Sequence, residues 1–399
     1  MFKGTVIAQI IAVLAAIFLA KIYGTNAYGI FGTFMSLATI LSITNTLQLE
    51  KCIVISKTKL ESENWQHFLF FLNPIISVII TLFAFFIIQF FYPGKIDNTI
   101  ILLGGFTAVI LSFNKTYEAF LTFTKVFSKI SFAKIIVVIV NITAQFILYS
   151  FYKNLGLIFG FIIASSTVFI YYSIKNKSFF KRFNFEDIKT SFQKNTSILR
   201  YLLPSNIINS IALHIMPILI LTYFSAKDAG VYFFSFKILA APLFLISSSI
   251  SQVFFKKSAE LYQQNKKELY ILSKKIAITN TLIMIVFLLF INTVGIYLLE
   301  LYLDNNWTNL REITLLLSFL ILTRASFNPI SSLSIVLSKN HISLIFNSYL
   351  FLVNIIAIYI GYLYNNILYS VTILSFFGGI GYLFLLGYFL RFLKKLQHV

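Results

Sequence analysis

Long apolar stretches alternate with short polar connections along almost the whole chain. Twelve of these stretches, each about 18 to 25 residues long, can cross a bilayer core of about 30 Å as helices, which takes about 20 residues. They cover residues 5–23, 28–47, 68–92, 99–120, 135–152 and 156–174, then 201–224, 230–254, 276–299, 313–337, 342–364 and 367–390. The pattern predicts an all-α integral membrane protein and excludes a soluble core.

The longest interruption, residues 175–200, divides the twelve stretches six and six. Its many basic and polar residues predict a cytoplasmic linker between two six-helix bundles, residues 1–174 and 201–399, the second with a short basic cytoplasmic tail. Each half has an even number of crossings and starts on the same side of the membrane. A repeat between them is therefore parallel, and we expect the two bundles to surround a central cavity.

A short internal repeat accompanies this division. Residues 23–31, Tyr-Gly-Thr-Asn-Ala-Tyr-Gly-Ile-Phe, align with residues 224–232, Phe-Ser-Ala-Lys-Asp-Ala-Gly-Val-Tyr, at a constant offset of 201. In both, an aromatic residue ends one helix, a polar turn follows, and Gly29 or Gly230 opens the next helix. Each hairpin leads to a longer basic loop, residues 50–65 and 256–275, with apolar residues at helical spacing that suit the cytoplasmic interface.

Charge fixes the expected orientation. Only 11% of the residues are charged, against about 25% in soluble domains, yet the net charge is +19. With the amino terminus inside, 25 of the 32 Lys and Arg residues fall in cytoplasmic segments and 5 in outer ones. Basic residues near helix ends are retained inside, so both termini are predicted to be cytoplasmic. This bias explains the charge through contact with membrane lipids, and no nucleic-acid partner is expected.

Several chemistries are missing from the sequence. A single cysteine, Cys52, excludes an internal disulfide and a cysteine metal cluster, and the chain has no P-loop, so we expect neither a metal nor a cofactor. The first stretch imitates a secretory signal but lacks a small-x-small cleavage site, so we expect it to remain as a helix. The outer connections are too short for a catalytic site, and we do not expect an enzyme.

Two cations inside apolar stretches are candidates for function, because such a residue costs about 2.5 to 3.5 kcal/mol at a helix centre. Arg324 lies eleven residues into the stretch 313–337, about 16 Å from its start, with Asn328 one turn later. We expect Arg324 to line a cavity, although helix carbonyls could also satisfy it. Lys237 is close enough to a helix end to reach the interface, so its role stays open. For Lys21, an interfacial anchor is favoured.

Two stripes of polar side chains also run along apolar stretches. Asn206, Ser210 and His214 follow one another at i+4 spacing, and Asn141 and Gln145 form a shorter stripe. Each stripe either lines a transport path or bonds neighbouring helices, and the spacing does not choose between these roles. A proton relay at His214 is the less favoured reading.

The chain resembles one known family in its length, in its twelve predicted crossings and in their division into two sets of six. The run at residues 20–31, Ala-Lys-Ile-Tyr-Gly-Thr-Asn-Ala-Tyr-Gly-Ile-Phe, with the basic loop from Glu50, resembles bacterial polysaccharide-unit flippases of the Wzx type. These belong to the multidrug/oligosaccharidyl-lipid/polysaccharide exporter superfamily. Residues 223–232, leading to Ser-Gln-Val-Phe-Phe at 251–255, are similar to the second-half counterpart of that motif.

The resemblance implies a substrate. It would be an oligosaccharide on undecaprenyl pyrophosphate, moved to the outer leaflet of the bacterial inner membrane for O-antigen or capsule assembly, with a polysaccharide polymerase and chain-length machinery as partners. Arg324 and Lys237 suit an anionic pyrophosphate. Lys21 matches a position that is commonly basic in the family. Met216 and Pro217 stand where relatives often carry an Asp-Arg pair, so the role of that pair does not transfer.

Three alternatives remain. A major-facilitator transporter would have a short loop with glycine and an Asp-Arg pair at residues 50–65, which contain neither glycine nor aspartate. A multidrug exporter of the same superfamily fits the crossings, but Arg324 and Lys237 would repel a cationic drug. A polysaccharide polymerase or glycosyltransferase is disfavoured by the short outer connections.

Overall fold

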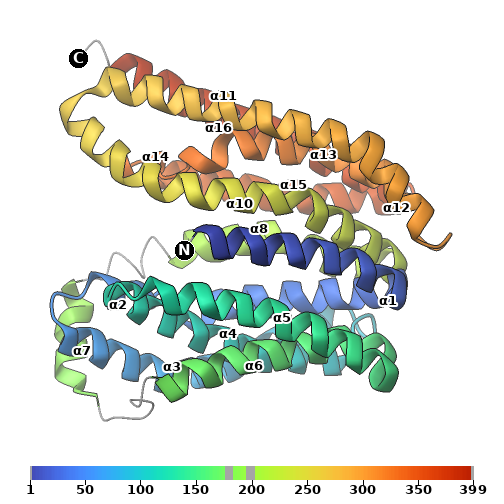
Figure 1. Ribbon diagram of the computed structural model, residues 1–399, viewed down its shortest axis with the longest axis horizontal. Coiled ribbons are helices and arrows are strands. Elements are labelled where there is room, and N and C mark those ends of the chain that lie inside the picture. Colours follow the sequence, from blue (N-terminus) through green and yellow to red (C-terminus); the bar gives the residue numbers. More distant parts are fainter. Residues whose placement is uncertain (1, 176–182, 195–202, 397–399) are drawn as a thin grey trace. The chain divides into compact units, whose positions relative to one another are not determined.

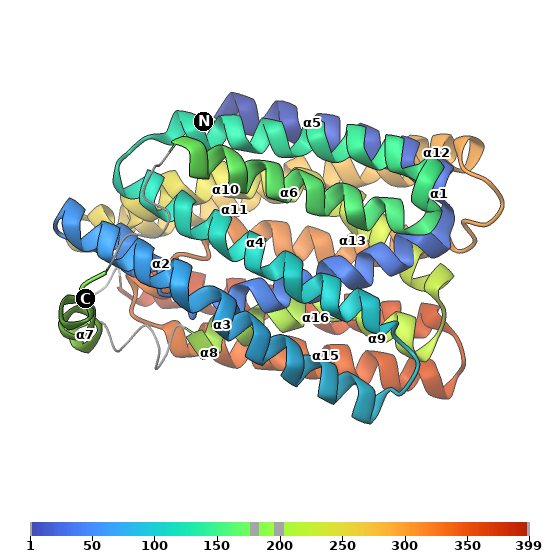
Figure 2. The ribbon, with the colours of Figure 1, turned by 90° about the horizontal axis from the view of Figure 1, so that it is seen from below.

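The computed structural model describes residues 2–175, 183–194 and 203–396, and this part of the chain is helical without strands (Figures 1 and 2). It forms two compact units, Met1–Gly230 and Val231–Val399. Of the predicted linker, residues 176–182 and 195–200 lie outside the described residues, as do residues 201–202 and 397–399. The predicted bundle limits at residues 174 and 201 stay a prediction.

The first unit contains most of the helices drawn from blue to green in Figure 1. Its α-helices are α1 (Phe2–Asn45), α2 (Glu50–Ile55), α3 (Lys59–Phe91), α4 (Asn98–Phe123), α5 (Phe127–Tyr152), α6 (Gly156–Lys175), α7 (Phe185–Lys194), α8 (Leu203–His214) and α9 (Met216–Tyr223). A 3₁₀ turn, η1 (Lys153–Leu155), joins α5 to α6. Helices α8 and α9 belong to this unit because they pack against α1.

The second unit contains most of α10 (Ala226–Gln264) and the helices that follow it. These are α11 (Lys266–Phe290), the π-helical turn η3 (Ile291–Gly295), α12 (Ile296–Tyr302), α13 (Leu310–Phe327), the 3₁₀ turn η4 (Asn328–Ile330), α14 (Leu333–Val336), α15 (Asn340–Leu363) and α16 (Ile367–Leu396). Helix α16 packs against α11, α13 and α15 and holds this unit together.

Membrane spans follow the predicted pattern. Eight helices in the described part are long and apolar enough to cross a bilayer, and the bent pair α8–α9 would make a ninth. Two of the eight, Gln9–Asn45 and Phe127–Ile174, each contain two predicted stretches, and α10 contains a further one. Within the described residues, every predicted stretch is therefore mainly helical, and the stretch 313–337 is broken into α13, η4 and α14.

Polar side chains begin several helices by accepting hydrogen bonds from their first free N–H groups. Thr58 accepts from the Glu61 N–H at 3.2 Å, Asp97 from Thr99 at 2.8 Å, and Asn265 from Glu268 at 3.0 Å. These caps place helix starts inside both predicted basic loops. The loop at 50–65 is α2 and the first turns of α3, and the loop at 256–275 is the end of α10 and the start of α11.

The predicted turn between the first two crossings is a kink within α1. Gly24 has φ 72° and ψ 178°, a backbone conformation that only glycine adopts without strain. The chain reverses direction at this kink (Figure 1), and close to it the Tyr28 hydroxyl donates to the Ala16 carbonyl at 2.7 Å. A single glycine therefore replaces the expected loop.

The repeated segments meet at their glycines. A Cβ placed on Gly29 would lie 1.9 Å from the carbonyl oxygen of Ala226, and one placed on Gly230 would lie 1.9 Å from that of Thr25. The sequence offset of 201 pairs Gly29 with Gly230 and Thr25 with Ala226. The contact between Gly29 and the Ala226 carbonyl is therefore equivalent to the contact between Gly230 and the Thr25 carbonyl. This reciprocity indicates a local two-fold relation between the repeats, and both glycines are needed for the backbones to approach so closely.

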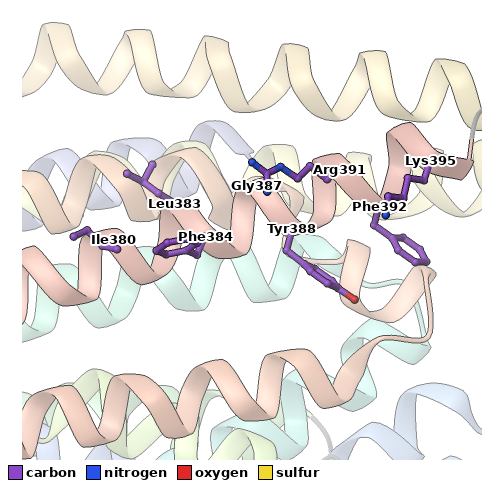
Figure 3. Close-up of a pocket in the computed structure, with 8 residues that line it drawn as sticks. All are labelled: Ile380, Leu383, Phe384, Gly387, Tyr388, Arg391, Phe392 and Lys395. Carbon is purple, nitrogen blue, oxygen red and sulfur yellow. The ribbon is translucent and has the colours of Figure 1, made fainter.

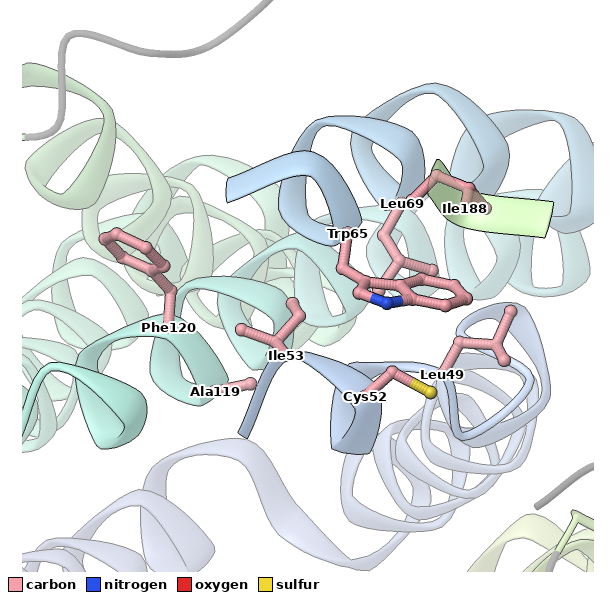
Figure 4. Close-up of a cluster of buried hydrophobic side chains, with 8 residues drawn as sticks. All are labelled: Leu49, Cys52, Ile53, Trp65, Leu69, Ala119, Phe120 and Ile188. Atoms are coloured by element: carbon pink, nitrogen blue, oxygen red, sulfur yellow. The ribbon is translucent and has the colours of Figure 1, made fainter. Parts of the chain in front are cut away.

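A cluster of buried apolar residues joins α2, α3, α4 and α7 at one end of the first unit (Figure 4). It comprises Leu49, Cys52, Ile53, Trp65, Leu69, Ala119, Phe120 and Ile188. Helix α7 lies across the ends of the spanning helices (Figure 1) and contributes Ile188, which is 3% exposed. The described part of the predicted linker is therefore attached to the first unit.

Chemical labelling of Cys52, the only cysteine, tests whether α7 packs on this cluster. Burial raises the pKa of the Cys52 thiol to about 12, and the charges of Glu50 and Glu61 add to the shift, so almost none is thiolate at neutral pH. We expect maleimide to react slowly with the native protein. Ile188→Ala, which removes about 2 kcal/mol or more of packing, should raise the labelling rate at least about tenfold, because the thiol gains water and its pKa falls.

Lys189→Ala is the matched control, because the Lys189 side chain on the same helix is exposed. Labelling of Ile188→Ala at the rate of this control would show that α7 does not protect the cluster.

Candidate functional site

Arg324 lies in the last turn of α13. The helix ends at Phe327 because Pro329 has no N–H to continue the hydrogen-bond ladder, and η4 follows. The prediction of one continuous helix over 313–337 is therefore wrong. Asn328 still lies one turn after Arg324, and its backbone N–H donates to the Arg324 carbonyl.

The Arg324 side chain is buried, with 7% of its surface exposed. Tyr232 of α10 and Tyr382 of α16 lie within range of its charge. Its Nε has no hydrogen-bond partner among the described residues.

The ion pairs in the described part of the chain do not involve Arg324. The ion pairs within the described ranges are Lys59 with Glu63 and Arg311 with Glu300, both of them solvent-accessible. Arg324 is thus a buried cation for which the described residues supply no carboxylate. A buried charge without a counter-ion costs several kcal/mol, so this site favours an anion that comes from outside the chain.

The other two predicted cations are less enclosed. Lys237 is partly buried on α10, two residues after Ser235, whose hydroxyl accepts a hydrogen bond from Thr314 of α13 at 3.1 Å. No hydrogen bond between described residues joins Lys237 to Arg324. Lys21 is exposed on α1, three residues before the Gly24 kink.

The longer polar stripe lies on α8, which meets α9 at an angle of 47°. Asn206 donates to the Gln48 side chain at 3.0 Å and so ties α8 to the end of α1. Ser210 is 2% exposed, and its hydroxyl has no partner in the described part of the chain. His214 ends α8 at the bend and is partly exposed. This bond supports the packing role for Asn206, whereas Ser210 and His214 lie towards the bend.

The shorter stripe bonds neighbouring helices. Asn141 donates to the Gln145 side chain at 3.4 Å, and Gln145 donates to the Leu157 carbonyl of α6 at 2.9 Å. Tyr23 of α1 donates to the Gln145 carbonyl. Gly160 leaves room for the Gln145 side chain. Of the two roles left open for this stripe, its hydrogen bonds support the packing role.

Sequence reasoning missed a partly buried charge cluster in the first unit. The Lys115 ammonium on α4 donates to the Ser42 hydroxyl of α1 at 3.0 Å, and the charges of Glu50 and Glu118 act on it. Glu118 also lies within range of Lys134. The only sequence signal was Lys115 and Glu118 at i+3 spacing inside an apolar stretch. Unlike Arg324, this lysine has carboxylates of its own chain nearby, which indicates a structural role.

Removing one charge from this cluster should destabilise the protein. Lys115→Met leaves the partly buried carboxylates of Glu50 and Glu118 without this partner, and we expect a loss of about 1 to 3 kcal/mol, measured as a lower melting temperature of the detergent-purified protein. The double variant Lys115→Met/Glu118→Gln should recover part of the loss.

The control removes the same charge from the surface: Lys95 is exposed between α3 and α4, and Lys95→Met should change stability by less than about 1 kcal/mol. Equal melting temperatures for Lys115→Met and Lys95→Met would contradict the structural role.

Comparison with known proteins places this geometry in context. A family model described as "Polysaccharide biosynthesis protein" matches residues 18–312. No curated protein matches the chain.

Three solved structures are similar over nearly the whole chain. The lipid II flippase MurJ in an inward closed conformation has a TM-score of 0.75 and 16% identity, covering 98% of this chain and 87% of that one. An inward-facing multidrug resistance MATE family transporter of the MOP superfamily has a TM-score of 0.69 and 16% identity, covering 97% and 96%. A MOP superfamily transporter from Pyrococcus furiosus has a TM-score of 0.60 and 16% identity, covering 99% and 96%. At this identity they establish the fold alone, and they confirm the predicted all-α membrane architecture.

Proposed function

Because the chain belongs to the polysaccharide biosynthesis protein family, we propose that it is a flippase for a lipid-linked oligosaccharide. The substrate is an O-antigen or capsule repeat unit on undecaprenyl pyrophosphate, moved from the cytoplasmic to the outer leaflet of the bacterial inner membrane. The fold of MOP-superfamily transporters supports movement of a substrate across the membrane. Both termini are cytoplasmic, in keeping with the distribution of Lys and Arg.

The buried, uncompensated charge of Arg324 carries this proposal. A pyrophosphate brings the negative charge that the described residues do not supply, and the planar guanidinium can donate two parallel hydrogen bonds to it. Lys237 adds positive charge on α10 of the same unit. The halves rock to alternate access while the lipid tail stays in the bilayer.

The same charge argues against the main alternative. A multidrug exporter of the superfamily would have the same fold, but a cationic drug beside Arg324 would meet repulsion rather than a counter-ion. The connection between α12 and α13, which the predicted orientation places outside, leaves only residues 303–309 outside the helices. A segment of this length is too short for the catalytic site of a polymerase. An anionic lipid-linked substrate therefore fits the structure better than either.

Deletion of the gene in its host tests the proposal. We expect lipid-linked repeat units to accumulate in the cytoplasmic leaflet and surface polysaccharide to disappear, and the intact gene should reverse both effects. Repeat units accumulating in the outer leaflet would indicate a polymerase instead. Unchanged polysaccharide together with new drug sensitivity would favour the exporter.

A further inference from the structure

A hollow of about 670 Å³ runs along one face of α16 in the second unit (Figure 3). Its lining includes Leu383, Phe384, Gly387, Tyr388, Arg391 and Lys395. The side chains of Phe384 and Leu383 are 75% and 46% exposed, so apolar surface lies open along this face. None of its described lining residues is a predicted substrate-site residue.

Charge divides the hollow into two ends. Arg391 and Lys395 lie one turn apart at its carboxyl-terminal end, and the other described lining residues are aliphatic, aromatic or glycine. The sequence of α16 contains no Asp or Glu, so neither cation has an acidic partner on its own helix. An anionic head and an apolar chain match these two ends.

A smaller hollow on the neighbouring stripe of α16 repeats the arrangement. It has a volume of about 230 Å³, and Leu386 and Leu390 of α16 face Ala277 and Thr281 of α11 there. Lys274 lies at the same end as Arg391, because α11 and α16 run antiparallel. A second apolar chain attached to the same head can therefore follow this stripe.

We infer that this face of α16 binds an anionic phospholipid from the cytoplasmic leaflet. The lipid phosphate contacts Arg391 and Lys395, and an acyl chain follows Gly387 and Phe384. Basic residues at this depth attract anionic headgroups by about 1 kcal/mol each. A free anion would gain nothing from the apolar part, and a zwitterionic lipid would gain less from the two cations. The inference concerns a bound membrane lipid and does not depend on the transported substrate.

Gly387 provides a way to fill the hollow without disturbing the fold. No described atom lies within 4 Å of a Cβ placed on this residue. Leucine is also a better helix former than glycine by about 0.5 to 1 kcal/mol. Gly387→Leu should therefore fold normally and occupy the space of the acyl chain.

The experiment measures lipid binding to the purified full-length protein by native mass spectrometry. Phosphatidylglycerol should bind at least about tenfold more tightly than phosphatidylcholine with the same chains, because the choline cation offsets the charge of the phosphate and is repelled by Arg391 and Lys395. A tenfold difference corresponds to about 1.4 kcal/mol. Gly387→Leu and the double variant Arg391→Gln/Lys395→Gln should each lose about tenfold in phosphatidylglycerol affinity. Lys256→Gln/Lys257→Gln removes the same charge from exposed positions on α10 and should retain it.

Three outcomes would overturn the inference. Equal affinity for the two phospholipids, or unchanged phosphatidylglycerol binding by both α16 variants, would show that no anionic lipid occupies this face. Competition by inorganic pyrophosphate alone would indicate a small-anion site. Binding of undecaprenyl pyrophosphate without binding of phosphatidylglycerol would assign the groove to the transported substrate.

Discussion

Arg324→Met should abolish transport of the lipid-linked oligosaccharide and at the same time raise the thermal stability of the protein. The two effects have one cause. Arg324 is buried, and the described residues give it no carboxylate, so without substrate its charge destabilises the fold, and methionine of similar length relieves that cost. With substrate, losing a buried charge partner costs about 2 to 5 kcal/mol, which is about 30-fold or more in binding. Arg324→Lys should transport partially, because it keeps the charge but loses the bidentate geometry.

Complementation of the deletion strain and the melting temperature of the purified variant measure these effects. Arg311→Met is the matched control, because the exposed Arg311 donates to Glu300 at 3.0 Å, and an exposed pair contributes about 1 kcal/mol or less. It should leave transport intact. If Arg324→Met lowered the melting temperature and still supported transport, Arg324 would be a structural residue satisfied by its own helix.

Gly29→Ala and Gly230→Ala should each destabilise the first unit strongly. A methyl group at either position would lie 1.9 Å from a backbone carbonyl oxygen, so the crossing segments must separate, at a cost of about 1 to 3 kcal/mol or more. The double variant should lose less than the sum of the two single losses, because the first methyl already separates the segments. Thermal unfolding of the three purified variants measures both the losses and their non-additivity.

Gly387→Ala serves as the control, because it adds a methyl where no described atom lies within 4 Å. It should stabilise α16 by about 0.5 to 1 kcal/mol. Wild-type melting temperatures for Gly29→Ala and Gly230→Ala would show that the repeats do not meet as closely as the structure has them.

The spanning helices could be predicted from the sequence because the bilayer imposes their length and apolarity. Pro329 is visible in the sequence, yet only the structure shows that it ends α13 rather than bending one long helix. The alignment of Gly29 with Gly230 revealed the repeat in the sequence. It did not predict that the two glycines are in contact, because segments that are equivalent in sequence need not be close in space.

Side-chain partners were harder to predict, because they depend on helix packing. The spacing of Asn141 and Gln145 fits a transport path or a packing contact equally well, and only the bond from Gln145 to Leu157 favours packing. Lys115 falls near the end of the predicted stretch 99–120, and Ser42, which accepts its hydrogen bond, lies 73 positions away on another helix. In contrast, Arg324 could be identified from sequence, because a cation deep in an apolar stretch is rare on energetic grounds.

Reconstitution of the purified protein in liposomes tests the central claim most directly. The lipid-linked oligosaccharide is placed in the inner leaflet, and its arrival in the outer leaflet is followed with an enzyme or lectin that cannot enter the vesicle. The account predicts that the wild-type protein moves the glycolipid between leaflets and that Arg324→Met does so no faster than protein-free liposomes. Wild-type protein that leaves the glycolipid where it was placed, or an Arg324→Met variant that moves it at the wild-type rate, would contradict the account.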